Sequence, residues 1–254
     1  MDGLAIWVIN LDRATDRMAR INAQLQALHL PFTRLSAVDA KALQPAQRAA
    51  FDEVAYRRKH GMNPVPGEIG CYLSHVEVVR AFVASDALFA LVFEDDALLH
   101  DSLPAVLGAL IAHPGRWDMV KLSAVHSGTP VPVLDLVPGH KLAVMLSRCT
   151  GASAYLINRR AAEAYLRSEG GLLPMQLPYD HVFDRGWDLG LKVRLVTPTP
   201  CTHDEKIPTT IDNPAGAKRK FHWTRRLPAF GWRLGSELQR VAYGLKHVLQ
   251  ERLG

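Results

Sequence analysis

Residues 87–96 read Ala-Leu-Phe-Ala-Leu-Val-Phe-Glu-Asp-Asp, an apolar run that ends abruptly in three acids. An uninterrupted apolar run of this length, bounded by charged residues, predicts a strand that is covered on both faces. Strands of this kind occur in sheets that carry helices on either side. The run therefore predicts the central strand of an α/β domain.

The segments around this strand alternate between two hydrophobic patterns. Short apolar runs predict further strands at residues 4–9, 32–35, 117–122, 152–157 and 192–196. Helical spacing predicts helices at residues 15–28, after Pro66-Gly67 with apolar positions from Ile69 to Val83, at 101–113 and at 159–167. Residues 134–146, with Pro138 and Gly139, and residues 172–177, with Pro174, are predicted to be loop-like or ambiguous. The alternation predicts an α/β fold, with a Rossmann-like, mostly parallel sheet flanked by helices.

The positive charge of the chain is concentrated near its end. Residues 218–252 hold nine Lys and Arg against Glu237 and Glu251, a net charge of +7, which leaves about −2 of the total +5 for residues 1–217. We therefore predict a main domain at 1–217 and a basic tail at 218–254. Nucleic acid is not an expected partner, because the main domain is slightly acidic and lacks a recognised binding motif.

The tail has the spacing of an amphipathic helix. Its apolar stripe follows steps of four and three and comprises Leu234, Leu238, Val241, Leu245 and Val248, continued by Arg252. Such a basic amphipathic helix can lie on an anionic lipid surface through residues 223–253. The alternative is that the stripe packs on the main domain or on a second subunit.

Cysteine usage and the N-terminus indicate a reducing compartment. Cys71, Cys149 and Cys201 are widely spaced and form no C-x-x-C pair, which argues against a disulfide framework and a zinc ribbon. The first residues lack the basic segment of a signal peptide, and no apolar stretch reaches the roughly 18–20 residues of a membrane span. We expect a cytoplasmic protein.

The acids at positions 94–96 are the strongest candidates for a site. Carboxylates a few ångströms apart resist joint ionisation, and a divalent cation compensates their repulsion. Ligands of open α/β sheets bind at the carboxyl ends of strands, and Mg²⁺ or Mn²⁺ prefers oxygen ligands. The alternative is a solvated turn that caps a following helix.

Several segments, taken in order, resemble glycosyltransferase family 25, which includes lipooligosaccharide and collagen galactosyltransferases. The resemblance rests on Val8-Ile-Asn-Leu-Asp12 with Arg13 and Arg17, Arg34-Leu-Ser-Ala-Val-Asp39, Gly67-Glu-Ile-Gly-Cys-Tyr-Leu-Ser-His75 and Leu91-Val-Phe-Glu-Asp-Asp96. It continues through Asp118-Met-Val-Lys-Leu-Ser123, Gly151-Ala-Ser-Ala-Tyr-Leu-Ile157 and Pro178-Tyr-Asp180. It covers roughly residues 4–211 and leaves the tail outside.

This resemblance implies a GT-A type fold that binds a nucleoside diphosphate sugar, usually UDP-galactose, with Mn²⁺, and inverts the anomeric carbon. With the tail, it suggests a lipid-linked saccharide acceptor of a lipopolysaccharide or lipooligosaccharide core. The acceptor would be met at the inner face of the cytoplasmic membrane. The alternative is a non-catalytic nucleotide-sugar or membrane-surface binding module with the same fold.

The resemblance also implies roles for individual residues. Asp96 and, more weakly, Glu94 are the expected metal ligands, and Asp180 is the hypothetical base that takes a proton from the acceptor hydroxyl. The expected donor-binding residues are Asn10, Arg13, Arg17, Asp39, Gly67, Glu68, Ser74, His75, Asp95, Lys121, Ser123, Gly151 and Ala152.

Each of these roles has a structural alternative. Arg17 can equally be an exposed helix arginine, and Lys121 a structural ion-pair partner. Asp39 and Asp180 can be helix caps. A lone histidine such as His75 on an amphipathic helix is more often a core or boundary residue than a catalyst.

Overall fold

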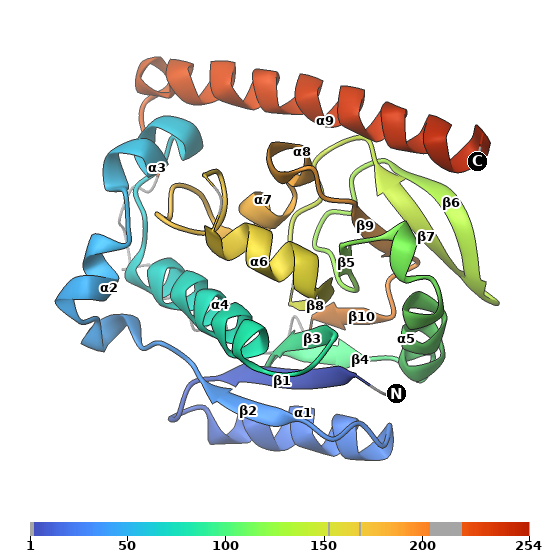
Figure 1. The fold of residues 1–254 in the computed structure, drawn as a ribbon. Coiled ribbons are helices and arrows are strands. Elements are labelled where there is room, and N and C mark those ends of the chain that lie inside the picture. The colour runs from blue at the N-terminus through green and yellow to red at the C-terminus, as the bar shows by residue number, and fades with distance from the viewer. Residues whose placement is uncertain (1–2, 152, 168, 204–219, 254) are drawn as a thin grey trace.

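The computed structural model describes residues 3–151, 153–167, 169–203 and 220–253. Within them, eight strands form one sheet in the order β2-β1-β3-β8-β5-β9-β7-β6 (Figure 1). The strands are β1 (Leu4–Asn10), β2 (Thr33–Ser36), β3 (Phe89–Glu94), β5 (Met119–Lys121), β6 (Pro130–Val137), β7 (His140–Met145), β8 (Ala154–Asn158) and β9 (Val193–Thr197). The predicted strands are confirmed to within a few residues.

Six of these strands run in one direction, and β7 and β8 run in the other. The three parallel neighbours are β1 with β2, β1 with β3, and β5 with β9. The sheet is therefore mixed, with most of its strands in the predicted common direction. A small second sheet pairs β4 (Ala97–Leu99) with β10 (Cys201–His203).

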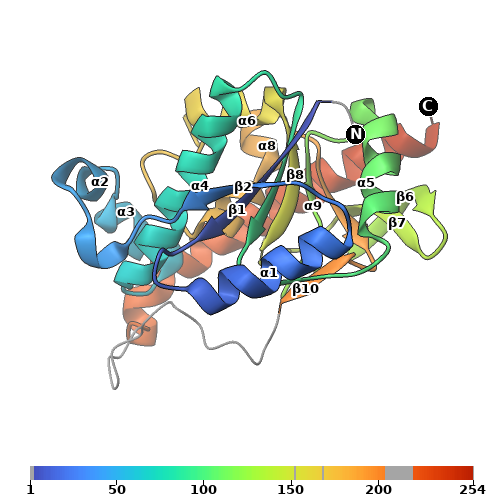
Figure 2. The same cartoon turned by 90° about the horizontal axis from the view of Figure 1, so that it is seen from below.

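Helices cover both faces of the sheet, as the apolar run at 87–93 predicts. Leu91 and Phe93 of β3 pack with α1 (Thr15–Ala27) and α5 (Leu103–Ala112), whereas Ala90 and Val92 pack with α4 (Pro66–Ala84) and α6 (Arg159–Arg167). Figure 2 shows α1 and α4 with β1 between them. Successive side chains of a strand point to opposite faces, so a strand buried on both sides must be apolar throughout.

Residues 134–146, predicted to be loop-like or ambiguous, are mostly strand. This region forms most of an antiparallel hairpin of β6 and β7, which turns at Gly139 with φ +86°. Pro130 and Pro132 lie in β6, the last strand of the sheet, where proline's missing N–H is tolerated because that edge has no further partner. Residues 172–177 are loop, as predicted.

Four further α-helices precede the tail. They are α2 (Pro45–Ala49) and α3 (Glu53–His60), which the hydrophobic pattern did not predict, and α7 (Tyr179–Phe183) and α8 (Gly186–Leu189). The predicted tail helix is α9 (Leu227–Leu253), which lies across α3, β6, β7 and α8. The predicted domain boundary at 217/218 lies outside the described residues.

No helix in the described part of the chain combines the length and hydrophobicity that crossing a membrane requires.

Candidate functional site

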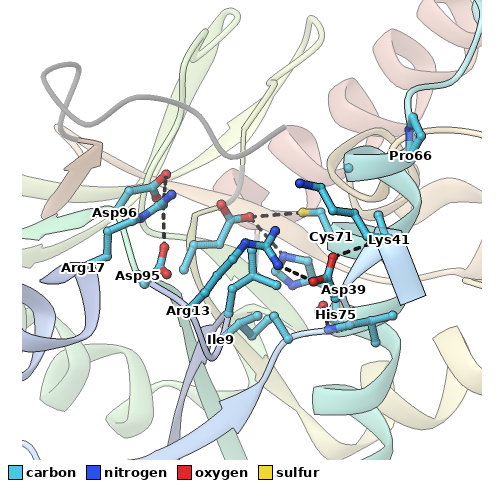
Figure 3. A pocket seen from close by; sticks show the side chains of 17 residues that line it. Ile9, Arg13, Arg17, Asp39, Lys41, Pro66, Cys71, His75, Asp95 and Asp96 are labelled. Atoms are coloured by element: carbon cyan, nitrogen blue, oxygen red, sulfur yellow. Dashed lines mark hydrogen bonds and ion pairs between the residues drawn. The ribbon is translucent and has the colours of Figure 1, made fainter. Parts of the chain in front are cut away.

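A cavity of about 240 Å³ opens at the carboxyl ends of the parallel neighbours β1 and β3 (Figure 3). The register pairs Ile9 with Glu94, so the segments that follow the two strands leave the sheet side by side. The cavity is lined by residues of four segments, 9–17, 37–41, 66–75 and 94–96: Ile9, Leu11, Arg13, Arg17, Ala37, Val38, Asp39, Ala40, Lys41, Pro66, Gly67, Cys71, Ser74, His75, Glu94, Asp95 and Asp96.

The structure brings many of the sequence-predicted site residues to this one cavity. They are Arg13, Arg17, Asp39, Gly67, Ser74, His75, Glu94, Asp95 and Asp96. Asn10, Glu68, Lys121, Ser123, Gly151 and Asp180 do not line it. Ala152 lies outside the described residues.

Arg17 of α1 balances the two aspartates of the acidic run. Its Nη2 lies 2.5 Å from Asp95 Oδ1 and 2.8 Å from Asp96 Oδ2, and its side chain is only 13% exposed. The alternative of an exposed helix arginine is therefore wrong. The acidic run is followed by β4, so the alternative that it caps a helix is also wrong.

The three acids differ in their proton affinity. Burial, and next the charge of Glu94, raise the pKa of Asp96 to about 6 against the opposing effect of Arg17. Burial also raises the pKa of Asp95. The Asp96 Oδ1 atom is buried and has no hydrogen-bond partner among the described residues. A buried carboxylate oxygen without a partner is costly, so this atom is available to a ligand.

Glu94 is held by a group of aromatic and imidazole side chains. Tyr179 of α7 donates a hydrogen bond to its Oε1, and His75 Nε2 lies 3.1 Å from the same oxygen. The His75 ring stacks on Tyr179 at 3.8 Å, and its Nδ1 lies 3.1 Å from the Tyr155 hydroxyl. Burial raises the pKa of Glu94, but the contacts from His75 and Tyr179 outweigh it and lower that pKa overall.

Cys71, His75 and Glu94 are also a group that can hold a metal ion. One ligand atom of each lies within 4.8 Å of the others. A thiolate, an imidazole and a carboxylate form a donor set suited to Zn²⁺, whereas Mn²⁺ and Mg²⁺ prefer oxygen ligands. Burial and the charge of Glu94 raise the pKa of the Cys71 thiol, which opposes metal binding by sulfur.

The residues 37–41 form the cavity wall opposite the acids. Ser74 Oγ accepts a hydrogen bond from the Val38 N–H at 2.8 Å and donates one to Gly70 O at 2.7 Å, so Ser74 anchors this wall to α4. Asp39 caps the short 3-10 turn Ala40–Ala42 and forms an ion pair with Arg13. Asp39 therefore has the structural role of a cap and also lines the cavity.

We expect Gly70→Ala to lower the free energy of unfolding by about 1–3 kcal/mol. A Cβ at Gly70 would lie 2.6 Å from Val38 O and 3.1 Å from Ala40 N, backbone atoms that cannot rotate away. Urea unfolding measures the change. The matched control is Gly108→Ala in α5, where a Cβ meets nothing within 4 Å and the variant should gain about 0.5–1 kcal/mol. Equal stability of the two variants would contradict the close packing.

Asn10 and Glu68 do not line the cavity but form hydrogen bonds with residues around it. Asn10 is buried, and its Nδ2 donates to Asp95 Oδ2 at 2.7 Å while its Oδ1 accepts from Arg34. Glu68 accepts a hydrogen bond from Tyr56 at 2.8 Å and caps the start of α4. Both residues position neighbours of the cavity.

A second group of predicted residues lies at the end of β5, before β8 and in α7. Lys121 is buried, and its Nζ donates to Cys149 O at 2.6 Å, while Ser123 Oγ accepts from the Ala154 N–H. The Gly151 N–H donates to Asp180 Oδ2 at 2.8 Å. Asp180 lies inside the first turn of α7 and Pro178 is the N-cap, so the alternative that Asp180 caps this helix is wrong.

Asp180 is connected to the cavity through its neighbours. Tyr179 contacts Glu94 and His75, and the charge of Asp180 contributes to the raised pKa of Cys71, which lines the cavity. Burial raises the pKa of Asp180 itself, but His181, Lys121 and the Gly151 N–H outweigh it and lower that pKa. Asp180 is therefore a carboxylate at neutral pH.

Three residues at this site, Lys41, Cys71 and Tyr179, had no predicted role. Cys71 and Tyr179 lie inside motifs that the resemblance quoted, so their position in those motifs was the available signal. Lys41 follows Asp39 in an unremarkable polar stretch, and only its place in the cavity wall identifies it.

Residues 4–129 match the sequence model of glycosyltransferase family 25, described as an LPS biosynthesis protein. The chain carries a glycosyltransferase family 25 domain. The match covers the cavity-lining residues, from Ile9 to Asp96. The predicted resemblance is therefore confirmed over the part of the chain that builds the cavity.

Individual relatives are similar to this chain over stretches of 95 to 194 residues. Procollagen galactosyltransferase 1-A of Xenopus laevis is 27% identical over 194 residues, which cover 69% of this chain and 30% of the relative. Procollagen galactosyltransferase 2 of Homo sapiens is 37% identical over 95 residues, 36% of this chain and 15% of the relative. Inactive glycosyltransferase 25 family member 3 of Mus musculus is 26% identical over 193 residues, 71% of this chain and 32% of the relative. The chain spans about a third or less of the length of these curated relatives.

Proposed function

We propose that this family 25 domain has a GT-A type fold and is an inverting, metal-dependent hexosyltransferase. It moves galactose from UDP-galactose to a lipid-linked saccharide of a lipopolysaccharide or lipooligosaccharide core, at the inner face of the cytoplasmic membrane. The observation that carries the proposal is the clustering of Glu94, Asp95 and Asp96 in one cavity at the carboxyl ends of β1 and β3. The names of the galactosyltransferase relatives support galactose.

Mn²⁺ or Mg²⁺ is the proposed cofactor, and the residues suit it. Asp96 lines the cavity with one buried carboxylate oxygen that has no partner in the described part of the chain, and Glu94 lines the same cavity. These two residues would hold the ion. When bound, a divalent ion stabilises the negative charge that grows on the departing diphosphate.

Other cavity residues are suited to the nucleotide diphosphate. Arg13 and Lys41 place two cationic side chains in the cavity wall, where they can bind phosphate oxygens. The N-terminus of α4 contributes Pro66 and Gly67, and the N-terminus of a long helix favours anions. The cavity therefore combines cations, a helix N-terminus and carboxylates within one site.

The proposed acceptor side lies toward α7. The attacking hydroxyl oxygen forms its bond to the anomeric carbon as the bond to the diphosphate oxygen breaks, and its proton passes to Asp180. The lowered pKa of Asp180 keeps it ionised, the state that a base must have before it accepts a proton.

A non-catalytic nucleotide-sugar binding module is the second candidate. The guanidinium of Arg17 already balances the negative charges of Asp95 and Asp96. The acids can therefore have a structural role in a protein that does not catalyse transfer. One relative of similar coverage is named as inactive. Turnover separates this candidate from the first.

Calorimetric titration with UDP-galactose, UDP-glucose and UDP-N-acetylgalactosamine, each with Mn²⁺ and with EDTA, tests the proposal. We expect Mn²⁺-dependent binding of UDP-galactose that Asp96→Ala weakens at least about tenfold, because the variant loses a metal ligand. Hydrolysis or transfer of the bound sugar distinguishes the enzyme from the binding module. Absence of binding to all three donors would reject both candidates.

The same titration has an expected pH dependence. Protons compete with the metal for Asp96, whose pKa is raised to about 6, so Mn²⁺ affinity should fall as the pH is lowered from 7 to about 5. The Asp96→Ala variant should lose this dependence near pH 6. An unchanged pH profile in that variant would assign the titration to another group.

A further inference from the structure

The face of α9 that meets the main domain consists largely of small and polar residues. Its buried members are Ala229, Ser236, Arg240, Gly244, His247 and Val248. A Cβ at Gly244 would lie 2.8 Å from Leu146 Cδ2 and 3.1 Å from Met145 O, so α9 approaches the end of β7 closely there. Val248 was predicted to belong to the apolar stripe, and its burial in this inner face corrects that assignment.

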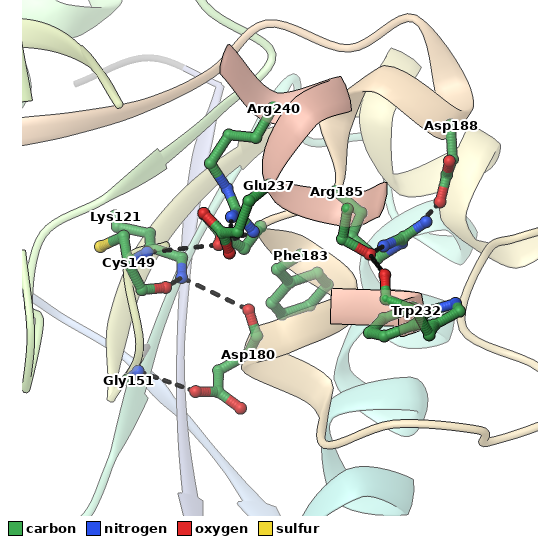
Figure 4. A network of polar contacts seen from close by, with 12 residues as sticks. Lys121, Cys149, Gly151, Asp180, Phe183, Arg185, Asp188, Trp232, Glu237 and Arg240 are labelled. Atoms are coloured by element: carbon green, nitrogen blue, oxygen red, sulfur yellow. Dashed lines mark hydrogen bonds and ion pairs between the residues drawn. The ribbon is translucent and has the colours of Figure 1, made fainter. Parts of the chain in front are cut away.

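Charged side chains on the inner face of α9 contact charged groups of the main domain, and Figure 4 shows the network of polar contacts around Arg240. Arg240 donates to Asp184 at 2.8 Å, and both side chains are almost completely buried. Near the other end of the helix, Glu251 pairs with Arg116 at 2.5 Å and with the buried Arg194 at 3.3 Å. Rotation of α9 about its axis would leave Arg194 without its ion-pair partner and Asp184 with only the Cys149 N–H and the charge of Lys121, which is unfavourable for buried charges.

The opposite face of α9 is apolar and exposed along its whole length. We call its large side chains the outer stripe: Leu227 (56% exposed), Phe230 (45%), Leu234 (64%), Leu238 (65%), Val241 (38%), Leu245 (46%), Leu249 (58%) and Leu253 (85%). At 1.5 Å per residue, a stripe of this length extends for about 40 Å. A contiguous exposed apolar surface of this extent marks an interaction site.

Cations predominate beside the outer stripe. Among the described residues from 220 onward, the exposed cations are Lys220, Arg225, Lys246 and Arg252, and the one acid with a substantially exposed side chain is Glu237, at 40%. The two acids of α9 are engaged, Glu237 by Arg240 and Glu251 by Arg116 and Arg194. The surface that accompanies the stripe is therefore cationic.

We propose that the outer stripe of α9 binds the surface of a bilayer that contains anionic phospholipids. An amphipathic helix lies in the plane of the interface, with its apolar side chains in the acyl boundary and its cations at the lipid headgroups. Two copies of α9 that met through their outer stripes would bring like charges together, which disfavours a second copy as the occupant. The inference deepens the proposed function by placing the enzyme beside a lipid-linked acceptor.

Flotation of the full chain with vesicles tests the inference without any assay of transfer. We expect the protein to float with phosphatidylcholine vesicles that contain about 30% phosphatidylglycerol, and to remain unbound with phosphatidylcholine alone. Leu234→Glu combined with Leu238→Glu should weaken binding more than tenfold, because it places carboxylates in the stripe. Both positions are exposed, so the variant should unfold at the same temperature as the unchanged chain.

The matched control adds the same two charges outside the stripe. Gln239→Glu with Gln250→Glu alters exposed positions of the same helix and should weaken binding less than the stripe variant does. Equal flotation of the stripe variant and the unchanged chain would overturn the inference. Equal binding of the unchanged chain to vesicles with and without phosphatidylglycerol would overturn it as well. A dimer in lipid-free sedimentation that the stripe variant dissociates would assign the stripe to a second copy and likewise overturn it. Flotation of a protein that binds no UDP-sugar would refute only the proposed function.

Discussion

Replacing Asp180 by Asn is expected to lower the rate of hexose transfer by about 10²–10⁴-fold, the usual contribution of a positioned base. Asparagine keeps an oxygen that can accept the hydrogen bond from the Gly151 N–H, so the contact that holds the side chain survives. The variant loses only the basic carboxylate. Donor affinity should therefore stay within a few-fold of that of the unchanged chain.

Single-turnover rates and calorimetric donor affinity, measured on the same preparation, separate catalysis from binding. Asp188→Asn is the control, because Asp188 pairs with Arg185 on α8 and does not line the cavity. This control should change the transfer rate less than about threefold, as expected for a residue outside the reaction. Near-normal turnover of Asp180→Asn with intact donor binding would remove Asp180 from the mechanism.

Arg240→Met is expected to lower the free energy of unfolding by about 3–5 kcal/mol at neutral pH, the cost of leaving a buried charge without its partner. Methionine fills most of the same space, so the loss comes from Asp184, which is buried beneath α9. Burial raises the pKa of Asp184, and removal of Arg240 raises it further. The loss should therefore shrink as the pH falls and Asp184 takes up a proton.

Urea unfolding at pH 7 and pH 5 measures both effects. Lys246→Met removes an exposed cation from the same helix and should change the free energy of unfolding by less than about 0.5 kcal/mol. Adding Asp184→Asn to Arg240→Met should recover part of the stability, because the buried carboxylate is gone. Identical losses in Arg240→Met and Lys246→Met would show that the buried pair does not stabilise the docking of α9.

The site was predictable where its residues are neighbours in sequence or follow a strand. Glu94, Asp95 and Asp96 lie at the carboxyl end of a buried strand. Ligands of open α/β sheets bind at that end of the strands, so the place of these acids in sequence indicates a site. The ion pair of Arg17 with two of these acids was not predictable, because α1 and β3 are distant in sequence and meet only through the parallel pairing of β1 with β3. The same holds for Tyr179, which reaches Glu94 from α7.

Local patterns also misled in one instance. Pro138 and Gly139 suggested a loop at residues 134–146, but they occupy only the turn of the β6–β7 hairpin, and Pro130 and Pro132 fall on the edge strand β6, where a missing N–H breaks no pairing. Whether a strand is central or at an edge depends on which segments pair, and a local pattern does not contain that information.

Apart from the β6–β7 hairpin and the short helices α2 and α3, the amino-acid sequence by itself determined the main elements: apolar runs became strands, helical spacing became helices, and residues 227–253 became a helix with an apolar stripe. Only the tertiary structure decided that this stripe points outward. Periodicity shows that a helix has two different faces. Which face is buried depends on the residues of the main domain that contact it. Here those residues are Asp184 and Arg194, buried charges from distant segments whose partners are Arg240 and Glu251 on α9.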